Sequence, residues 1–389
     1  MKIVELTAFV VRIPLKKPVK HASHVRSETD NIVVRCTLDD GTIGHGEGVP
    51  RDYVTGETAE SAIDLLKSAN LGSQLEQCDS FAEVVAFAEK LTLPAVPGDT
   101  RGIAGNAARC AVELAVLDAF GRAFGEPLTM VTKLAAPDLY QFRNRVRYSG
   151  AITSARGLKA RFAAWRMRIY RFKQVKIKVG IEGYDDVERL RVIRSRIGRK
   201  MDLRVDANEA WSAAETVDRI SELEPYGLTS VEQPVSHAEV GQLARIRKAV
   251  KTPIMLDESL CGPVDAKQAI DNGLCDLFNL RLSKCGGFIP SLRLAQQAKQ
   301  AGLGYQLGCQ IGETAILSAA GRHFACSVAD LRYVEGSYDR HLVKESLGKD
   351  DITFGWGGVA PFLNSIGLGV IIDPMRLARV TLRQEKLLD

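Results

Sequence analysis

The stretch Val175-Lys176-Ile177-Lys178-Val179 places two lysines inside a short run of β-branched apolar residues, which is typical of a buried strand. Seven further apolar runs lie on either side of it, and segments of helical length separate them. The eight runs cover residues 146–152, 175–179, 202–206, 230–232, 254–257, 277–280, 304–307 and 331–334. This alternation predicts the α/β class and a parallel (β/α)8 barrel of the TIM type. A doubly wound open sheet is the alternative, but such sheets usually stop at about five or six strands.

The N-terminal third has a different pattern. Residues 3–13 and 31–38 are rich in Val, Ile and Thr, and Asp40-Gly41 favours a hairpin turn into a third strand. Helical periodicity follows at about 56–69, 80–91 and 106–124. Residues 366–383 suggest one or two more strands that pack back on this unit. We therefore expect an α+β capping domain at 1–130, the barrel at 131–350 and a returning C-terminal segment at 351–389.

Composition excludes several classes of protein. Apolar residues make up 46% of the 389 residues and charged residues 25%, which is usual for a folded globular chain. The net charge of +5 is too small to indicate nucleic-acid binding, and we interpret the basic residues between Arg161 and Lys173 as a solvated helix face. No apolar stretch reaches the length of a membrane span, and the N-terminus lacks the pattern of a signal peptide. The eight cysteines show no C-x-x-C spacing, so we expect reduced thiols in a cytoplasmic protein.

Five charged residues fall at the carboxyl ends of consecutive predicted strands: Lys178, Asp206, Glu232, Asp257 and Lys284. Their spacing of one strand-helix unit brings them to the same end of a barrel, where active sites lie. Three adjacent carboxylates would repel one another, and a divalent cation removes that repulsion. Ligation by oxygen alone predicts Mg²⁺, with Mn²⁺ as the second choice.

The two lysines flank the three carboxylates, one strand before and one strand after. A lysine that is partly desolvated beside a cation has a lowered pKa and can act as a base. Mg²⁺ can stabilise the enediolate that forms when a small carboxylate substrate loses its α-proton. Lys176 lies two residues from Lys178, so both point to the same face of the strand, and its charge should lower the pKa of Lys178 further.

These segments resemble the enolase superfamily, and the Lys-x-Lys element is similar to its muconate lactonizing subgroup. The resemblance rests on Val175–Lys178, Val205–Asn208, Val231–Pro234, Leu256–Ser259 and Ser283–Gly287. It implies that Asp206, Glu232 and Asp257 bind the metal, that Lys178 and Lys284 are the acid and base, and that Lys176 assists them. It also implies that Asn208 lies beside the metal and that Glu258 supports the metal ligands.

Substrate selection in this subgroup depends on the capping loops and the last barrel strands. The candidates here are His24, Arg26, Tyr53, Gln310, Glu313 and Glu335. Dipeptide epimerases similar to this chain carry Asp-x-Asp after the eighth strand, where this chain has Glu335-Gly336-Ser337. One acid is kept and one is lost, which weakens the argument for a dipeptide substrate.

The favoured function is a Mg²⁺-dependent isomerase, a racemase or epimerase of an amino-acid derivative or dipeptide. A muconate-type cycloisomerase and a lyase similar to o-succinylbenzoate synthase use the same residues and remain alternatives. A barrel that binds metal without turnover is the alternative from a different class. We expect no nucleic-acid or membrane partner, and we expect a homo-oligomer, since symmetric assemblies are common among such barrels.

Overall fold

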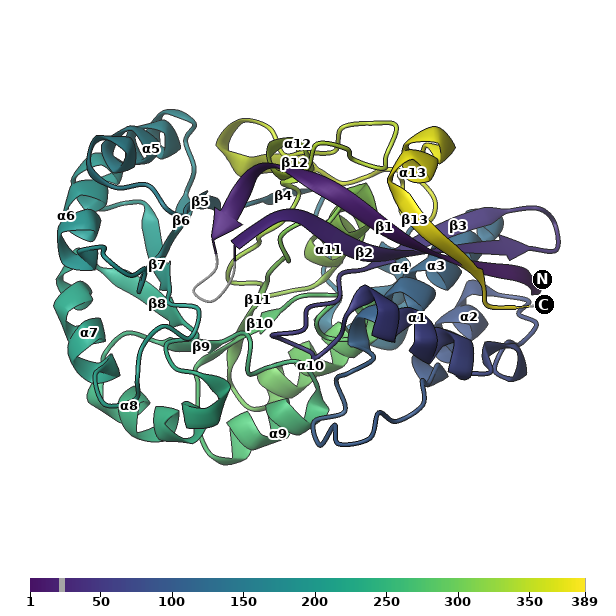
Figure 1. Ribbon diagram of the computed structural model, residues 1–389, viewed down its shortest axis with the longest axis horizontal. Coiled ribbons are helices and arrows are strands. Elements are labelled where there is room, and N and C mark those ends of the chain that lie inside the picture. The colour runs from purple at the N-terminus through teal and green to yellow at the C-terminus, as the bar shows by residue number, and fades with distance from the viewer. Residues whose placement is uncertain (21–24, 389) are drawn as a thin grey trace.

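Seven parallel strands form one curled sheet, in the order β11-β10-β9-β8-β7-β6-β5 (Figure 1). The structure is a computed structural model, and it describes residues 1–20 and 25–388. The strands are β5 (Gly150–Ile152), β6 (Gln174–Lys178), β7 (Asp202–Asp206), β8 (Leu228–Glu232), β9 (Ile254–Leu256), β10 (Leu277–Leu280) and β11 (Gly304–Leu307). The helices after them are α5 (Gly157–Ile169), α6 (Asp186–Ile197), α7 (Thr216–Leu223), α8 (Leu243–Ala249), α9 (Pro263–Asp271), α10 (Phe288–Gln300) and α11 (Ala315–Ser327). The predicted α/β class and TIM-type architecture are confirmed.

The eighth predicted run forms only part of a strand. Val334 makes an isolated parallel bridge to Leu307, and its carbonyl oxygen accepts a hydrogen bond of 2.8 Å from the backbone N–H of Ser149. The first run is also shorter in the barrel than predicted, because Arg145–Arg147 (β4) pairs with Val359–Pro361 (β12) instead. The ring of strands therefore closes through a few backbone bonds rather than through a full eighth strand.

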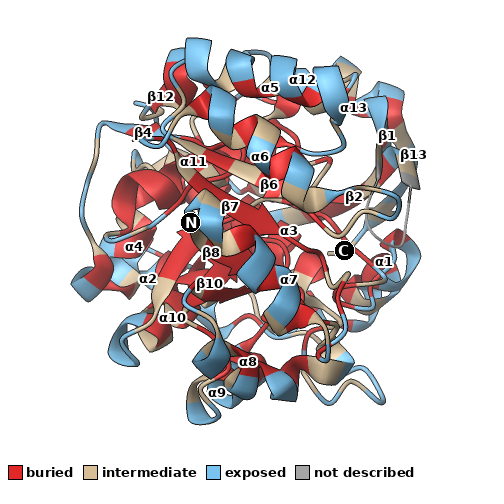
Figure 2. Cartoon of the chain, turned by 90° about the vertical axis from the view of Figure 1, so that its left-hand side faces the viewer, coloured by how far each residue is buried: buried red, intermediate tan, exposed pale blue. Residues whose placement is uncertain are grey.

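Apolar side chains of the strands form the core between sheet and helices. Val175 and Ile177 of β6 and Leu203 and Val205 of β7 have no exposed surface. Figure 2 shows the buried strands at the centre, enclosed by helices whose outer faces are exposed. Polar side chains that alternate with these residues must then point into the barrel, which places the site.

The capping unit is built on an antiparallel sheet in the order β13-β1-β2-β3. Its strands are β1 (Ile3–Lys20), β2 (Val25–Leu38), β3 (Ile43–Gly48) and β13 (Thr381–Lys386), and its helices are α1 (Ala59–Ser68), α2 (Phe81–Lys90), α3 (Asn106–Phe124) and α4 (Thr129–Ala135). The first and last strands of the chain lie side by side (Figure 1), because β13 pairs with β1. The three predicted strands and three predicted helices are present.

The C-terminal segment differs from its prediction. Only its last part is a strand, and residues 374–380 form α13 (Pro374–Val380). The Asp373 carboxylate caps this helix by accepting hydrogen bonds from the backbone N–H groups of Met375 and Arg376, and Pro374 suits the first turn. The short helix α12 (Asp339–Leu342) completes the helices on this side.

The glycines of Gly44-His45-Gly46-Glu47-Gly48 lie in β3. Backbone approaches them closely: a Cβ on Gly46 would lie 2.0 Å from the carbonyl oxygen of Ala111 in α3. Three alternating glycines therefore let α3 pack directly on the strand.

Two further expectations concern thiols and membranes. The eight cysteines are free thiols, and all but Cys309 are buried. Within residues 1–20 and 25–388, no helix combines the length and apolar character needed to span a membrane.

Candidate active site

Lys176 and Lys178 lie on β6 with the alternation that the sequence suggested. Val175 and Ile177 face the core, while the two lysines are partly buried and share the inner face. In the register of the sheet, Lys178 pairs with Asp206, and Asp206 pairs with Glu232. The structure therefore brings one lysine and two of the carboxylates together on three neighbouring strand ends.

The third carboxylate follows β9. Asp257 stands directly after Leu256, and its side chain has no exposed surface. Lys284 lies in the turn after β10 and is also buried. Its Nζ donates to the Asp257 carboxylate (2.9 Å), the Asp257 carbonyl oxygen (2.6 Å) and the Asn279 carbonyl oxygen (3.0 Å). These three bonds fix the position of the Lys284 ammonium group.

Positive side chains bridge the carboxylates. Lys176 Nζ lies 3.3 Å from Asp206 Oδ2, 3.2 Å from Glu232 Oε2 and 2.9 Å from Glu335 Oε2. Arg281 contacts Asp257 through Nη2, and the same nitrogen lies 3.5 Å from Glu232 Oε1. A buried charge without a partner is costly, so these contacts keep the cluster electrically balanced.

Burial and neighbouring charges change the pKa values of the cluster. Burial raises the pKa of Asp206 and of Glu232. Burial lowers the pKa of Lys178, and the positive charge of Lys176 adds to this effect, as the sequence suggested. For Lys176 itself, burial opposes the charged form, but Glu232, Glu335 and Asp206 outweigh it and raise the pKa.

The three carboxylates provide the type of ligand that a divalent cation prefers. Asp206, Glu232 and Asp257 supply only oxygen, are nearly or fully buried, and lie at the ends of adjacent strands, which suits a hard cation. In the described part of the chain, no group of three or more Asp, Glu, His or Cys side chains has the arrangement that would hold a metal ion. Lys176 and Arg281 stand between the carboxylates instead, so a cation would bind here with a change of these side-chain positions.

Asn208 and Glu258 support this cluster. The backbone N–H of Asn208 donates to Asp206 Oδ1 (3.1 Å), and its Nδ2 donates to Glu258 Oε1 (3.1 Å). Asn208 and Gln233 both have positive φ angles, of 45° and 36°, directly after β7 and β8. Such strained backbone persists where the surrounding structure demands it, as at functional sites.

The candidate substrate residues fall into separate groups. Glu335 lies beside the metal-ligand candidates, where its carboxylate contacts Lys176. Gln310 and Glu313 lie together in the loop after β11, where the Gln310 backbone N–H donates to Glu313 Oε1 (2.6 Å), and burial raises the Glu313 pKa to about 8. Arg26 lies over the Tyr53 ring at 5.3 Å on the capping unit. His24 lies outside the described residues.

Three residues of the cluster were missed as site candidates: Arg204, Asn279 and Arg281. Arg204 has no exposed surface and contacts Glu335 through Nη2, and Asn279 Nδ2 donates to Glu232 Oε1 (2.7 Å). Arg204 lies opposite Lys176 in the register, two residues before Asp206. A polar residue inside an apolar strand, in phase with a site residue, is the sequence signal that would have found Arg204.

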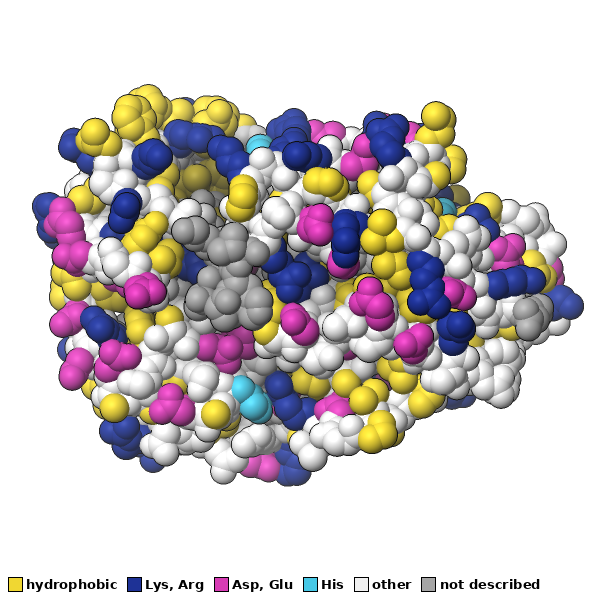
Figure 3. All heavy atoms as spheres, viewed as in Figure 1, with side chains coloured by type: hydrophobic (Ala, Val, Ile, Leu, Met, Phe, Trp, Pro, Cys, Tyr) yellow, Lys and Arg dark blue, Asp and Glu magenta, His cyan; other side chains and the backbone are white. Residues whose placement is uncertain are grey.

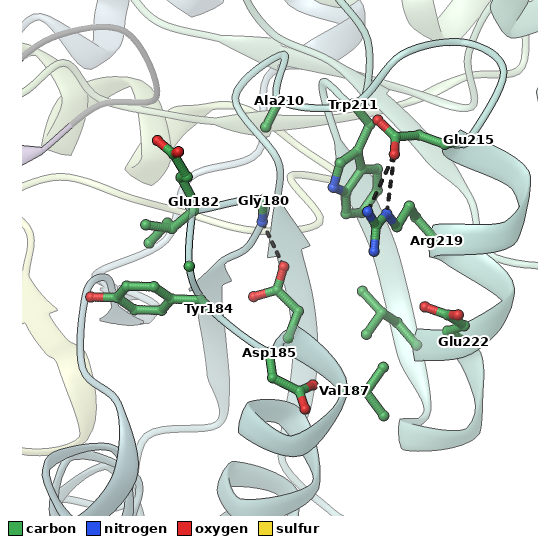
Figure 4. Close-up of a pocket in the computed structure, with 14 residues that line it drawn as sticks. Gly180, Glu182, Tyr184, Asp185, Val187, Ala210, Trp211, Glu215, Arg219 and Glu222 are labelled. Carbon is green, nitrogen blue, oxygen red and sulfur yellow. Dashed lines mark hydrogen bonds and ion pairs between the residues drawn. The ribbon is translucent and has the colours of Figure 1, made fainter.

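A cavity of about 380 Å³ lies apart from this cluster, beside the loops that follow β6 and β7 (Figure 4). Acidic side chains line much of it, and Arg219 turns toward Glu215 (3.3 Å) rather than into the space. The cavity contains none of the predicted site residues, so its volume does not indicate the reaction site.

Comparison with known proteins identifies the family. Residues 3–131 match the mandelate racemase / muconate lactonizing enzyme N-terminal domain, and residues 159–376 match the enolase C-terminal domain-like family. The chain belongs to the enolase superfamily.

Three relatives illustrate the place of the chain in this superfamily. The chain is 30% identical to the N-succinyl-L-Arg/Lys racemase of Bacillus cereus, over 86% of this chain and 87% of the relative. The crystal structure of an N-succinyl Arg/Lys racemase from the same organism superposes on 99% of this chain and 100% of the racemase chain, with a TM-score of 0.86. The chain is 30% identical to the L-Ala-D/L-Glu epimerase of Bacillus subtilis, over 95% of this chain and 97% of the relative. The crystal structure of a dipeptide epimerase from Cytophaga hutchinsonii, complexed with Mg and D-Ala-L-Val, superposes on this chain over the full length of both chains, at 26% sequence identity and with a TM-score of 0.84.

These relatives determine the class of enzyme. They are named racemases and epimerases, which are isomerases. The chain is an isomerase of the racemase and epimerase type within the enolase superfamily, and the muconate lactonizing subgroup is confirmed.

Proposed function

We propose that this enolase-superfamily member inverts the α-carbon of an N-acylated amino acid, with Lys178 and Lys284 exchanging the proton. The observation that carries the proposal is the placement of these two lysines on either side of Asp206, Glu232 and Asp257. A substrate carboxylate directed at that acidic centre would present its α-carbon between one amine on β6 and another in the turn after β10. One amine can remove the α-proton, and the other can return a proton to the opposite face.

The two lysines differ in the protonation state that their surroundings favour. Burial lowers the pKa of Lys178, which favours the neutral amine that a base requires. Lys284 is held by three acceptor oxygens, and the Asp257 carboxylate outweighs burial to raise its pKa. In one direction Lys178 Nζ takes the proton from the α-carbon and Lys284 Nζ donates one; in the reverse direction the roles exchange.

The carboxylates of Asp206, Glu232 and Asp257 would hold Mg²⁺. When bound, Mg²⁺ would stabilise the negative charge that develops on the substrate carboxylate as the α-proton leaves. Lys176 would move from between the carboxylates as the cation binds, but on β6 it would stay beside this centre, where its positive charge would favour binding of the anionic substrate.

The surroundings of Glu335 support a blocked substrate nitrogen. One oxygen of this carboxylate contacts Arg204 and the other contacts Lys176 at 2.9 Å, and although burial alone would raise its pKa, these two cations lower it to about 2. Both oxygens are therefore engaged by cations, which leaves Glu335 poorly placed to bind the ammonium group of a dipeptide. An N-acyl group carries no such charge. The B. cereus relative, whose name gives an N-succinyl substrate, is consistent with this choice.

The test is deuterium uptake in D₂O with Mg²⁺, followed by mass spectrometry. Separate reactions would contain N-succinyl amino acids, free dipeptides and cis,cis-muconate. We expect a gain of one deuterium in an N-succinyl amino acid, together with loss of optical rotation, and at least about a thousandfold loss of both in Lys178→Ala and Lys284→Ala. Uptake in dipeptides alone would refute the blocked-nitrogen argument. Deuterated lactone from muconate, or no uptake from any substrate by Mg²⁺-loaded protein, would refute racemisation.

A further inference from the structure

Helix α5 presents a row of large apolar side chains to solvent. Leu158 is 70% exposed, Phe162 67% and Trp165 52%, and Ile169 continues the row at the end of the helix. Isolated exposed apolar residues are ordinary, but four on successive turns of one helix form a continuous stripe. The proposed proton transfer makes no use of this surface.

Helix geometry shows that the stripe points directly away from the protein. At about 100° per residue, Leu158, Phe162, Trp165 and Ile169 fall within about 60° of one another. The buried residues Ala160 and Ala164 lie on the opposite side, against the barrel. The small alanines provide the buried contact of α5 with the barrel, whereas much of the surface of the four large side chains remains exposed.

The stripe continues onto a neighbouring loop. The ring of Tyr170, which follows α5, lies 4.8 Å from the ring of Trp356 in the 3₁₀ turn Trp356–Gly358. Both side chains are exposed. We call this surface the α5 patch, and it consists of Leu158, Phe162, Trp165, Ile169, Tyr170 and Trp356.

Positive charges border the α5 patch on both sides. Lys159 and Arg166 lie along one edge of the stripe, and Arg161 and Arg168 lie along the other. Helix α5 carries these four cations and no Asp or Glu, while the whole chain has a net charge of only +5. Figure 3 shows apolar and basic side chains side by side over α5.

We propose that the α5 patch binds the surface of an anionic lipid bilayer. An exposed helix with Trp, Phe and Leu at its crest and Lys and Arg along its edges has the pattern of an interfacial helix. The apolar crest would enter the headgroup boundary, and the flanking cations would bind the lipid phosphates. This attachment goes beyond the proposed reaction and needs no membrane-spanning helix, and it replaces the expectation from the sequence that the basic face of α5 is only solvated and that the chain has no membrane partner.

Other occupants fit the patch less well. A symmetric contact with a second copy would set the basic edges of one patch against those of the other, which is repulsive. A single-stranded nucleic acid is bound in a positively charged groove, whereas α5 is a convex surface. A flat anionic surface matches both the shape and the charge.

The test is co-sedimentation of the Mg²⁺-loaded full chain with vesicles. One set contains phosphatidylcholine alone, and the other contains phosphatidylcholine and phosphatidylglycerol in equal amounts. We expect strong binding only to the anionic vesicles. The partition coefficient should fall at least about tenfold when the salt concentration rises from about 0.05 M to about 0.5 M, because salt screens the attraction between the cations and the lipid phosphates. Phe162→Ser with Trp165→Ser should lower the partition coefficient at least about tenfold, and Arg161→Gln should lower it about fivefold.

Matched variants identify the surface. Met375→Ser removes an exposed apolar side chain elsewhere, and Lys248→Gln removes an exposed charge on α8; both should bind like the unmodified chain. Racemase activity should stay unchanged in all of them, which shows that they are folded. Equal binding to neutral and anionic vesicles, or to neither, would overturn the proposal. So would a dimer of the unmodified chain that Phe162→Ser with Trp165→Ser dissociates, or equally tight binding of a single-stranded oligonucleotide through the same residues.

Discussion

Glu335 neutralises two buried cations at once, Lys176 on β6 and Arg204 on β7. Glu335→Gln keeps the shape of the side chain and removes its charge. Arg204 would keep its contacts with the Ser149 hydroxyl (3.2 Å) and the Tyr333 ring, but it would lose the carboxylate charge that balances its own. We expect a loss of about 3 kcal/mol in the free energy of unfolding, since removing one partner of a buried pair leaves an uncompensated charge. Urea unfolding followed by circular dichroism measures it.

Glu89→Gln is the matched control for Glu335→Gln. It removes a carboxylate from a surface pair with Arg293, in which both side chains are more than one third exposed. An exposed pair contributes less than about 1 kcal/mol. If the two variants lose equal stability, the Glu335 contacts are not the buried pair that the structure describes.

Glu47 links the cap to the barrel and should make stability depend on pH. Its buried carboxylate accepts hydrogen bonds from Asn31 Nδ2 and from the backbone N–H groups of Thr314 and Leu317. Burial raises its pKa from 4.5 to about 7 despite these bonds. Between these values the folded state holds a proton that the unfolded state has released, so stability is full below about pH 4.5 and falls as the pH rises to about 7.

Glu47→Gln should remove this contribution. We expect the decrease in unfolding free energy between about pH 4.5 and 7 to become smaller by about 2–3 kcal/mol in the variant. Unfolding free energies measured at several pH values test the expectation. A variant whose stability falls as steeply as that of the unmodified chain would show that Glu47 does not retain its proton in the folded state.

At the scale of elements, the contact between β3 and α3 depends on glycine. Cβ atoms placed on Gly44, Gly46 and Gly48 would lie 2.0–2.1 Å from backbone atoms of α3, which no side-chain rotation can relieve. Gly46→Ala should therefore lower stability by about 3 kcal/mol or more, or prevent folding, because strand and helix must separate. Gly241→Ala is the control, since its Cβ meets nothing within 4 Å. Thermal unfolding of the two variants, together with their soluble yields, gives the comparison; a stable Gly46→Ala protein would contradict the packing.

How far the elements could be predicted from sequence depends on what specifies them. The six barrel strands β6 to β11 and the helix Asn106–Phe124 have strong local patterns, and their predicted positions agree with the structure. The role of the three glycines in β3 could not be predicted, because it depends on packing against a helix about 60 residues further along the chain, which no local pattern reveals. The prediction of strands over residues 366–383 is wrong for most of the segment, because Asp373 and Pro374 begin a short helix within an apolar stretch that resembles a strand.

At the scale of the whole molecule, the spacing of Lys178, Asp206, Glu232, Asp257 and Lys284 predicted which residues the sheet assembles, because one strand-helix unit separates each pair. It could not predict the cations that balance them. The phase of Arg204 on its strand indicates that it faces the site, but its contact with Glu335 and the contact of Arg281 with Asp257 form only when the sheet curls. The roles of the five residues as acid, base and metal ligands remain predictions.

Metal binding should stabilise the entire fold, because Asp206, Glu232 and Asp257 come together only when β7, β8 and β9 are in register. A ligand that binds only the folded chain raises the free energy of unfolding by about 2.7 kcal/mol at a hundred times its dissociation constant. We expect the midpoint of thermal unfolding to rise with Mg²⁺ concentration in the unmodified chain and in Asp330→Asn, whose carboxylate is exposed and remote. Glu232→Gln should show no rise, whatever its own starting stability, since each variant is compared with itself. An equal rise in Glu232→Gln would place the Mg²⁺ site elsewhere on the molecule, while no rise in the unmodified chain would exclude Mg²⁺ as a ligand of this cluster.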